Sequence, residues 1–175
     1  ELPKVDIKMG RDGLNKLLRE QGLLIRKTKR FHVTTDSNHF YYTSPNRIKE
    51  IEITHAEQVF VTDITYIKTE ECHAYLALVT DAYSKKIMGY YVADNMNTHS
   101  SVMALNMAIR QRKSKEIPLI HHSDRGLQYC ANDYQKILSK NGILPSMTQN
   151  SDPYENAVAE RINGILKQEF MIDSY

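Results

Sequence analysis

Three β-rich segments in close succession constrain the fold of this chain more than any other feature of its sequence. They span residues 59–68, 74–84 and 86–95, and each is dense in β-branched and aromatic residues, which favour strands. The connections between them are short, as in hairpins, so the three segments predict an antiparallel meander.

The residues after the meander alternate between helical and strand patterns. The expected elements are a helix at 98–112, a strand at 118–124, a helix around 132–141, a strand at 144–148 and a final helix. The order β-β-β-α-β-α-β-α predicts an α/β fold, in which a mixed five-stranded sheet carries helices on both faces.

Two of these helices have recognisable start signals. Thr98 is the expected cap of the first. For the last, Asp152 can cap the helix, Pro153 suits its first position, and Glu155 stands where a capping-box carboxylate reaches back to the cap.

The residues before the meander divide into two regions. Residues 1–24 end in a leucine-rich helical pattern that Gly22 can stop. Residues 25–57 are first basic, then rich in Thr, Ser, Asn and Tyr, and are interpreted as a linker. We expect the catalytic core to occupy residues 58–175 and to be cut short at its C-terminal end.

Composition narrows the class of protein. The 175 residues are 41% hydrophobic, enough for one ordinary core. No apolar run approaches the ~20 residues that span a bilayer, and the polar start lacks a signal-peptide pattern, so we expect a soluble, cytoplasmic protein. Cys72 and Cys130 lack metal-site spacing and are expected to be reduced packing residues.

Positive charge is local rather than general. The formal net charge is only +2, which permits nucleic-acid binding without requiring it. The basic residues gather in two clusters, namely Arg26, Lys27, Lys29 and Arg30, and Arg110, Arg112, Lys113 and Lys115. Taken alone, either cluster can be a solvated face or a linker.

Three acidic residues are candidate ligands for metal ions. Asp63 interrupts an otherwise uncharged strand, Asp124 ends a later strand, and Glu160 lies on the final helix. Cleavage of phosphodiesters with two cations needs several carboxylates that converge from different elements. Each acid alone could instead be a turn, cap or solvated residue.

Other residues compete for the same role. Asp81 also follows a β-rich run, but it is better interpreted as a residue that ends the strand and shapes the turn into Ser84 and Lys85. His121 and His122 adjoin Asp124, and strand alternation directs them to opposite faces, so at most one of them can face the site.

The final helix has a polar face of small and charged residues. This face carries Asn156, Glu160, Asn163, Gly164 and Lys167, while Val158, Ile162, Ile165 and Leu166 fall largely on the other side. Gly164, between Glu160 and Lys167, leaves room for another backbone to approach. The face is arranged to meet a partner.

Four ordered motifs resemble the catalytic core of DDE transposases of bacterial insertion sequences, the orfB-type relatives of retroviral integrases. The motifs are VFVTDITYIK, DAYSKKIMGYY, HHSDRGLQY and SMTQNSDPYENAVAERINGILKQEF. Thirty-five residues separate Asp124 from Glu160, the interval typical of the family's second and third catalytic acids. The resemblance implies a ribonuclease-H-like fold and makes Asp63, Asp124 and Glu160 the expected catalytic triad.

The resemblance also implies partners and cofactors. Lys167 matches a basic position that holds DNA near the active site in integrases, and Asn156, Asn163 and the basic cluster at 26–30 are further candidate DNA contacts. The leucine-rich start resembles the end of a helix-turn-helix region. Two Mg²⁺ ions are expected, with Mn²⁺ as a substitute.

The expected activity is metal-dependent strand cleavage and strand transfer at the ends of an insertion sequence. The enzyme would act as a homo-oligomer on terminal repeats and target DNA, with an upstream-frame helix-turn-helix protein as a possible partner, in a bacterial cytoplasm at the nucleoid. Two alternatives remain, a ribonuclease-H-like nuclease without strand transfer and an inactive, domesticated DNA-binding protein. A purely structural domain is a third possibility, and it predicts no metal-dependent change in stability.

Overall fold

A computed structural model describes residues 10–23, 41–68, 73–149 and 156–172. The chain divides into two compact units, residues 1–32 and 33–175, and each is described by itself. In the first unit, α1 (Arg11–Glu20) is followed by Gly22, whose φ of +66° ends the helix in the left-handed conformation that glycine adopts easily. The expected stop at Gly22 is thus confirmed.

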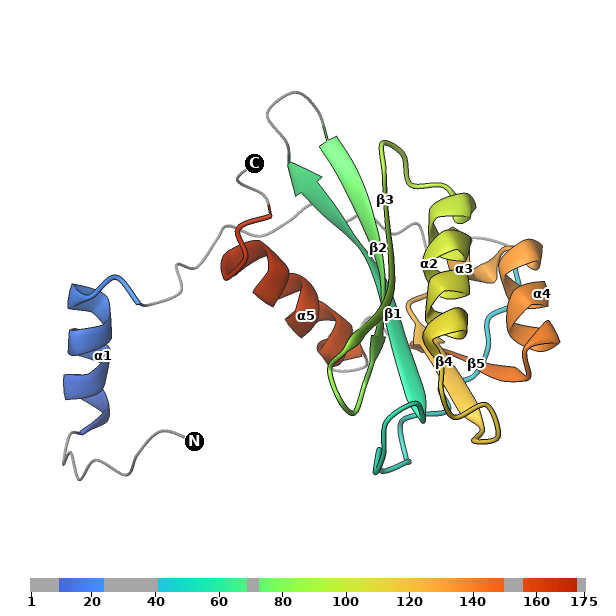
Figure 1. The fold of residues 1–175 in the computed structure, drawn as a ribbon, viewed down its shortest axis with the longest axis horizontal. Coiled ribbons are helices and arrows are strands. Elements are labelled where there is room, and N and C mark those ends of the chain that lie inside the picture. Colours follow the sequence, from blue (N-terminus) through green and yellow to red (C-terminus); the bar gives the residue numbers. More distant parts are fainter. Residues whose placement is uncertain (1–9, 24–40, 69–72, 150–155, 173–175) are drawn as a thin grey trace. The chain divides into compact units, whose positions relative to one another are not determined.

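The second unit is built on one five-stranded mixed sheet, as predicted (Figure 1). Its strands are β1 (Val59–Lys68), β2 (His73–Asp81), β3 (Ile87–Ala93), β4 (Leu119–Ser123) and β5 (Ile143–Met147). They lie in the order β3-β2-β1-β4-β5. The first three pair antiparallel, whereas β1 with β4 and β4 with β5 are parallel. The central strand β1 therefore joins the meander to the parallel part.

Helices cover both faces of this sheet, as expected. On one face lie α2 (Thr98–Gln111), α3 (Leu127–Cys130) and α4 (Asn132–Lys140), and on the other lies α5 (Ala157–Gln168) (Figure 1). Two details differ from the predictions. Thr98 is the first residue of its helix rather than the cap, a position that Asn97 occupies without a side-chain hydrogen bond. The four-residue α3 was not predicted, because one turn is too short to show a helical period.

The predicted start of the last helix, at Asp152, Pro153 and Glu155, lies outside the described residues. So do Cys72 and the basic cluster at residues 26–30. Within the described part of the chain, no helix is long and apolar enough to cross a membrane.

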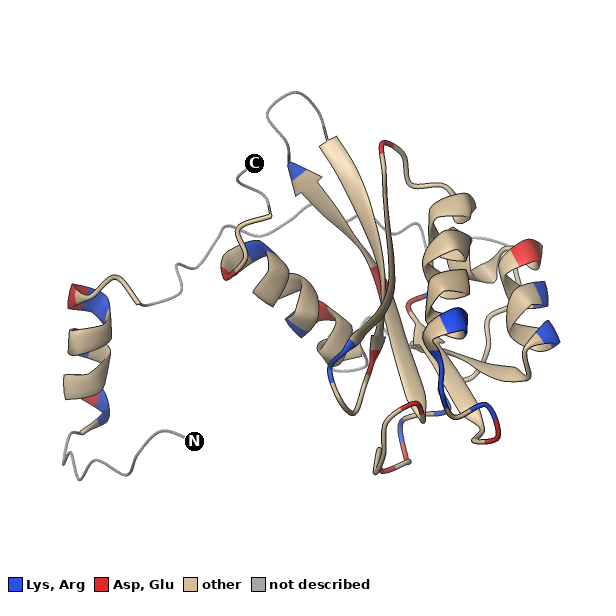
Figure 2. Cartoon of the chain, viewed as in Figure 1, with Lys and Arg blue, Asp and Glu red and all other residues tan. Residues whose placement is uncertain are grey.

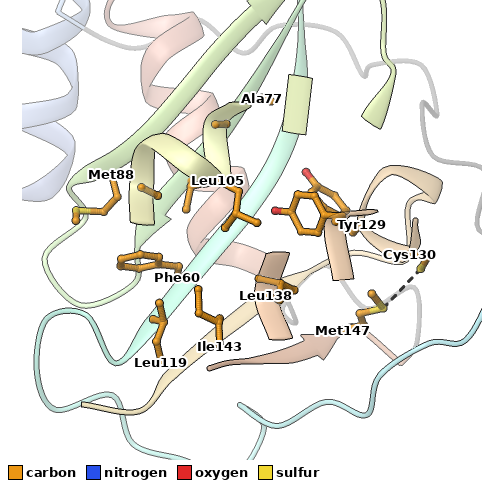
Figure 3. Close-up of a cluster of buried hydrophobic side chains, with 14 residues drawn as sticks. Phe60, Ala77, Met88, Leu105, Leu119, Tyr129, Cys130, Leu138, Ile143 and Met147 are labelled. Carbon is orange, nitrogen blue, oxygen red and sulfur yellow. Dashed lines mark hydrogen bonds between the residues drawn. The ribbon is translucent and has the colours of Figure 1, made fainter. Parts of the chain in front are cut away.

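The residues of β1 alternate between two hydrophobic layers. Phe60 and Ile64 belong to the layer beneath α2, α3 and α4 (Figure 3). Val59, Val61 and Ile67 face the opposite way and pack in two clusters that include α5 residues. A side chain at an odd-numbered position of β1 is thereby directed toward α5.

The segment 41–57, predicted as linker, contains no helix or strand but is attached to the core. Arg47 donates from its backbone N to Ser146 Oγ at 2.9 Å and from Nε to Pro145 O at 3.0 Å. Gln149 Nε2 donates to Ser44 O at 3.0 Å. These bonds hold the segment beside β5, the edge strand of the sheet.

Candidate active site

Two neighbouring parallel strands carry Asp63 and Asp124 to the same level of the sheet. The β1–β4 register pairs Val61 with His122, and continuing it by two residues sets Asp63 level with Asp124, the residue directly after β4. Asp63 is two residues from Val61, which packs on the α5 side, so its side chain lies on that face, and the charge of Asp124 acts on it. The parallel pairing of β1 with β4 thus brings the first two predicted acids together.

Asp63 is held at both carboxylate oxygens. Oδ1 accepts a hydrogen bond from the backbone N of Ile64 at 2.9 Å, and Oδ2 accepts one from Asn163 Nδ2 at 2.6 Å. Burial, then the charges of Asp124 and Glu160, raise the pKa of Asp63 from 3.8 to about 7, against the smaller opposing effect of the two hydrogen bonds. The three predicted acids therefore interact through space.

Asp124 begins a tight turn that leads into α3. Its Oδ1 accepts from the backbone N of Gly126 at 3.0 Å. A Cβ built on Gly126 would lie 3.0 Å from that same Oδ1 and 3.0 Å from Gln128 Oε1. A side chain at position 126 would thus crowd the carboxylate, so glycine lets the backbone approach Asp124 closely.

The helix α5 lies over β1 and presents its residues at different depths. Ala159 and Ile162 are buried against the sheet, while Glu160 is exposed. Partial shielding from water raises the pKa of the Glu160 carboxyl. Gly164 has open space around a built Cβ, in agreement with the predicted room for another backbone, and Lys167 is half-buried further along the helix.

Asn163 does not lie on the exposed polar face where the helical spacing placed it. It is only 7% exposed, and its amide donates to Asp63. Asn156, one of the other predicted DNA contacts, is half-buried and donates from Nδ2 to Thr62 O at 3.4 Å. The burial of Asn163 was not expected from the sequence, although its position four residues after buried Ala159 indicates the inward side of the helix. The role of Asn163 and Asn156 as DNA contacts stays a prediction.

Asp81, the competing carboxylate, shapes the turn after β2, as predicted. It is buried and accepts hydrogen bonds from the backbone N of Glu57 at 3.1 Å, from the backbone N of Ser84 at 3.1 Å and from Ser84 Oγ. These contacts explain its burial without any ligand.

The two histidines beside Asp124 point to opposite faces and are both buried, which confirms the predicted alternation. His121 Nε2 bonds to the Tyr134 hydroxyl at 2.8 Å, and His122 Nδ1 bonds to Ser146 Oγ at 2.9 Å. Burial lowers the pKa of His121 to about 3, so its ring is neutral. Cys130 is buried with its thiol 3.8 Å from Met147 Sδ, in agreement with the expected packing role (Figure 3).

The second basic cluster is only partly a solvated face (Figure 2). Arg112 is buried and donates to Ile117 O. The backbone N atoms of Lys113 and Ser114 donate to the carboxylate of buried Glu57 at 2.7–3.0 Å. Part of this cluster is thus structural, and it anchors the loop after α2.

The site contains the type of ligand that binds divalent cations, but its side chains do not form a complete binding site in the described residues. Among the described residues, no three His, Cys, Asp or Glu side chains are grouped closely enough to hold an ion. The donors that approach each other are nevertheless carboxylates, whose repulsion is visible in the raised pKa of Asp63. Hard cations such as Mg²⁺ prefer such oxygen ligands and offset the repulsion, so the donor set fits such an ion.

Comparison with known proteins shows which family and which relatives this chain resembles. Residues 53–153 match the family model described as the integrase core domain. The chain is 39% identical over 170 residues to the uncharacterized 31 kDa protein of insertion element IS600 from Shigella sonnei, covering 97% of this chain and 62% of the relative. It is 39% identical over 118 residues to a putative transposase of IS986/IS6110 from Mycobacterium tuberculosis, covering 65% and 42%.

A solved structure shows the same fold. A chain of the simian T-cell lymphotropic virus intasome superposes with a TM-score of 0.58 at 20% identity, over 74% of this chain and 45% of that one. The ribonuclease-H-like fold implied by the motifs is thereby confirmed. The chain spans less than two thirds of the length of either sequence relative.

Proposed function

The chain belongs to the integrase core domain family, and from this membership we propose that it is the catalytic core of a DNA transposase. In this proposal it cleaves DNA strands at the ends of an insertion sequence and joins them to target DNA. The observation that carries the proposal is the placement of three acids on different elements: Asp63 on β1, Asp124 directly after the neighbouring β4, and Glu160 on α5, with the charges of the other two acting on Asp63. Acids that converge from different elements are arranged to share cations.

The proposed roles follow from where each acid is attached. Asp63 on β1 and Asp124, directly after the neighbouring β4, would hold the two cations, and Glu160, exposed on α5, would complete the set of ligands. When bound, the cations supply the positive charge that activates the attacking hydroxyl and stabilises the leaving oxygen. Mg²⁺ suits these oxygen ligands, and Mn²⁺ is the expected substitute.

No side chain needs to form a covalent bond with DNA in this scheme. The same carboxylates can therefore serve hydrolysis by water and joining by a DNA 3′-hydroxyl. Lys167 and the exposed flank of α5 at Gly164 contact the DNA backbone, Asn156 lies at the edge of the same region, and the basic residues 26–30 add charge. We further propose that the protein acts as a homo-oligomer, with a helix-turn-helix protein as a possible partner, at the bacterial nucleoid.

The direct test compares how metal ions stabilise the variants Asp63→Asn and Asp81→Asn. At about 100 times its dissociation constant, Mg²⁺ or Mn²⁺ should stabilise the wild-type chain by ~2.7 kcal/mol, a rise in Tm of roughly 5–10 °C. Asp63→Asn should lose most of that rise. Asp81→Asn should lower the starting Tm, because a turn is weakened, yet keep the rise. Equal losses of the metal response in both variants would show that the wrong carboxylates were chosen.

Activity separates the remaining alternatives. A longer protein that includes this core should join a supplied 3′-hydroxyl end to target DNA, and Asp63→Asn should abolish that joining. Cleavage without joined product would favour a nuclease that lacks strand transfer. DNA binding without any metal-dependent stabilisation would favour an inactive, domesticated binding protein.

A further inference from the structure

Asn163 on α5 and Asn156, the residue directly before α5, both bond to β1, and the side-chain oxygen of each is unpaired among the described residues. The two asparagines are seven residues apart, and they donate from Nδ2 to two adjacent residues of β1. The Oδ1 atoms of both are buried and have no hydrogen-bond partner among the described residues. Buried polar atoms are normally paired, so an orphaned acceptor beside a carboxylate site calls for an explanation.

The two asparagines differ in what they hold. Asn156 donates to the backbone carbonyl of Thr62, a group that strand geometry already fixes. Asn163 donates at 2.6 Å to Oδ2 of Asp63, a side-chain group that would otherwise turn about its own bonds. A short bond to a charged acceptor is stronger than a neutral one, and here it joins residues 100 positions apart.

We propose that Asn163 is a positioning residue that fixes the Asp63 carboxylate for cation binding, an inference that rests on the proposed function. Oδ1 and Oδ2 of Asp63 each accept one hydrogen bond, from Ile64 N and from Asn163. Because each carboxylate oxygen has two acceptor positions, one remains on each for a cation. The two bonds thus orient the group without consuming its capacity to bind.

The side-chain oxygen Oδ1 of Asn163 has no hydrogen-bond partner among the described residues, so it can accept a further hydrogen bond. The chemistry that satisfies a buried amide oxygen is a hydrogen-bond donor, and a hydrated divalent cation brings donors in its own water shell. The amide of Asn163 would then hold the ligand through its nitrogen and the cation's water through its oxygen. Asn163→Asp would add a fourth negative charge to those of Asp63, Asp124 and Glu160. Asn163→Leu would remove both the hydrogen bond to Asp63 and the free amide oxygen.

The test measures Mn²⁺ binding directly, by the loss of the free-ion electron paramagnetic resonance signal, on the full chain. Asn163→Leu should raise the dissociation constant by about 10–100-fold, the usual cost of removing a group that orients a metal ligand. Asn156→Leu, the matched control at the residue directly before the same helix, should leave it unchanged. Thermal unfolding in EDTA should show that both variants fold, with a lower Tm for Asn163→Leu, because Asp63 Oδ2 loses its hydrogen-bond donor.

Asn163→Ala provides a second variant that cannot clash, and it should show the same loss of affinity as leucine. Wild-type affinity in Asn163→Ala would overturn the inference while leaving the proposed function intact. Equal loss in Asn156→Leu and Asn163→Leu would also overturn it, because both would then act through the placement of α5. A wild-type chain that binds no Mn²⁺ overturns the proposed function, and the inference with it.

Discussion

Asp63 combines two properties that rarely coincide in a folded protein. It accepts two hydrogen bonds, which lower its pKa, and yet burial and two neighbouring acids raise that pKa to about 7. Burial together with the charge repulsion therefore exceeds the stabilisation that the two hydrogen bonds give to the ionised form. Ionising such a carboxyl costs free energy in the protein without a cation. A bound cation stabilises the ionised form and offsets that cost.

The raised pKa of Asp63 predicts how stability and cation binding depend on pH. The folded-state pKa of Asp63, about 7, exceeds the ordinary aspartate value of 3.8, so the folded chain binds the extra proton between these two pH values. In EDTA, this group's contribution to unfolding free energy should therefore fall as pH rises from about 4 to 7 and level off above. Asp63→Asn should flatten that slope, as urea unfolding at several pH values would reveal.

Mn²⁺ affinity should change in the opposite direction, because the cation needs the ionised carboxylate. The dissociation constant should fall by up to about tenfold per pH unit below pH 7 and become constant above it. An affinity independent of pH between 5.5 and 8 would contradict the raised pKa of Asp63.

At the scale of elements, β3 and α2 pack closely against each other at Gly89. Gly89 is buried on β3, and a Cβ built there would lie 2.1 Å from Ala104 O and 2.8 Å from Ala108 N. These are backbone atoms of α2, which no side-chain rotation can move away. The helix can pack this closely only because position 89 has no side chain.

Gly89→Ala should therefore destabilise the fold by ~3 kcal/mol or more, because α2 must shift as a whole. Denaturant unfolding of the variant would measure the loss. Gly126→Ala is a suitable comparison, since its tight contacts are side-chain oxygens that can give way, and it should cost less stability. A loss below about 1 kcal/mol at position 89 would mean that β3 and α2 are packed less closely than described.

Elements also show where sequence reasoning succeeds and fails. The strand at 59–68 was placed to the residue, because VFVTDITYIK is continuous in β-forming residues. The one-turn helix α3 was not predicted, because four residues are too few to show a helical repeat of apolar positions. The burial of Asn163 was not predicted either, because its polar side chain was grouped with the polar face of the helix. The attachment of Arg47 to Pro145 and Ser146 joins residues 98 and 99 positions apart, a pairing that no local pattern encodes.

At the scale of the whole molecule, the proposed DNA contact on α5 can be tested at Gly164. This glycine lies mid-helix, where glycine costs about 1 kcal/mol relative to alanine, and no atom of the described residues lies within 4 Å of a Cβ built on it. Packing within the described part of the chain therefore gives no reason for glycine there, whereas the proposed approach of a DNA backbone would.

Gly164→Ala should accordingly raise the unfolding free energy by ~0.5–1 kcal/mol and weaken DNA binding at the same time. Denaturant unfolding and a fluorescence titration with an insertion-sequence end, in a longer protein that includes this core, would measure the two effects. Gln168→Ala, also exposed on α5, serves as the control and should change neither strongly. Increased stability with unchanged DNA affinity would separate Gly164 from any DNA contact.

The order of the strands has a consequence for how the protein is made. The meander β1-β2-β3 is local in sequence and can pair early, but the parallel strands β4 and β5 must wait for the chain between them. Asp63 is translated long before Asp124, and Glu160 follows only after every strand of the sheet. A ribosome-bound intermediate that stops short of α5 therefore carries a nearly complete sheet but only part of the proposed catalytic triad. If all three acids are required for the proposed cleavage, nascent and prematurely terminated chains cannot nick the DNA that encodes them.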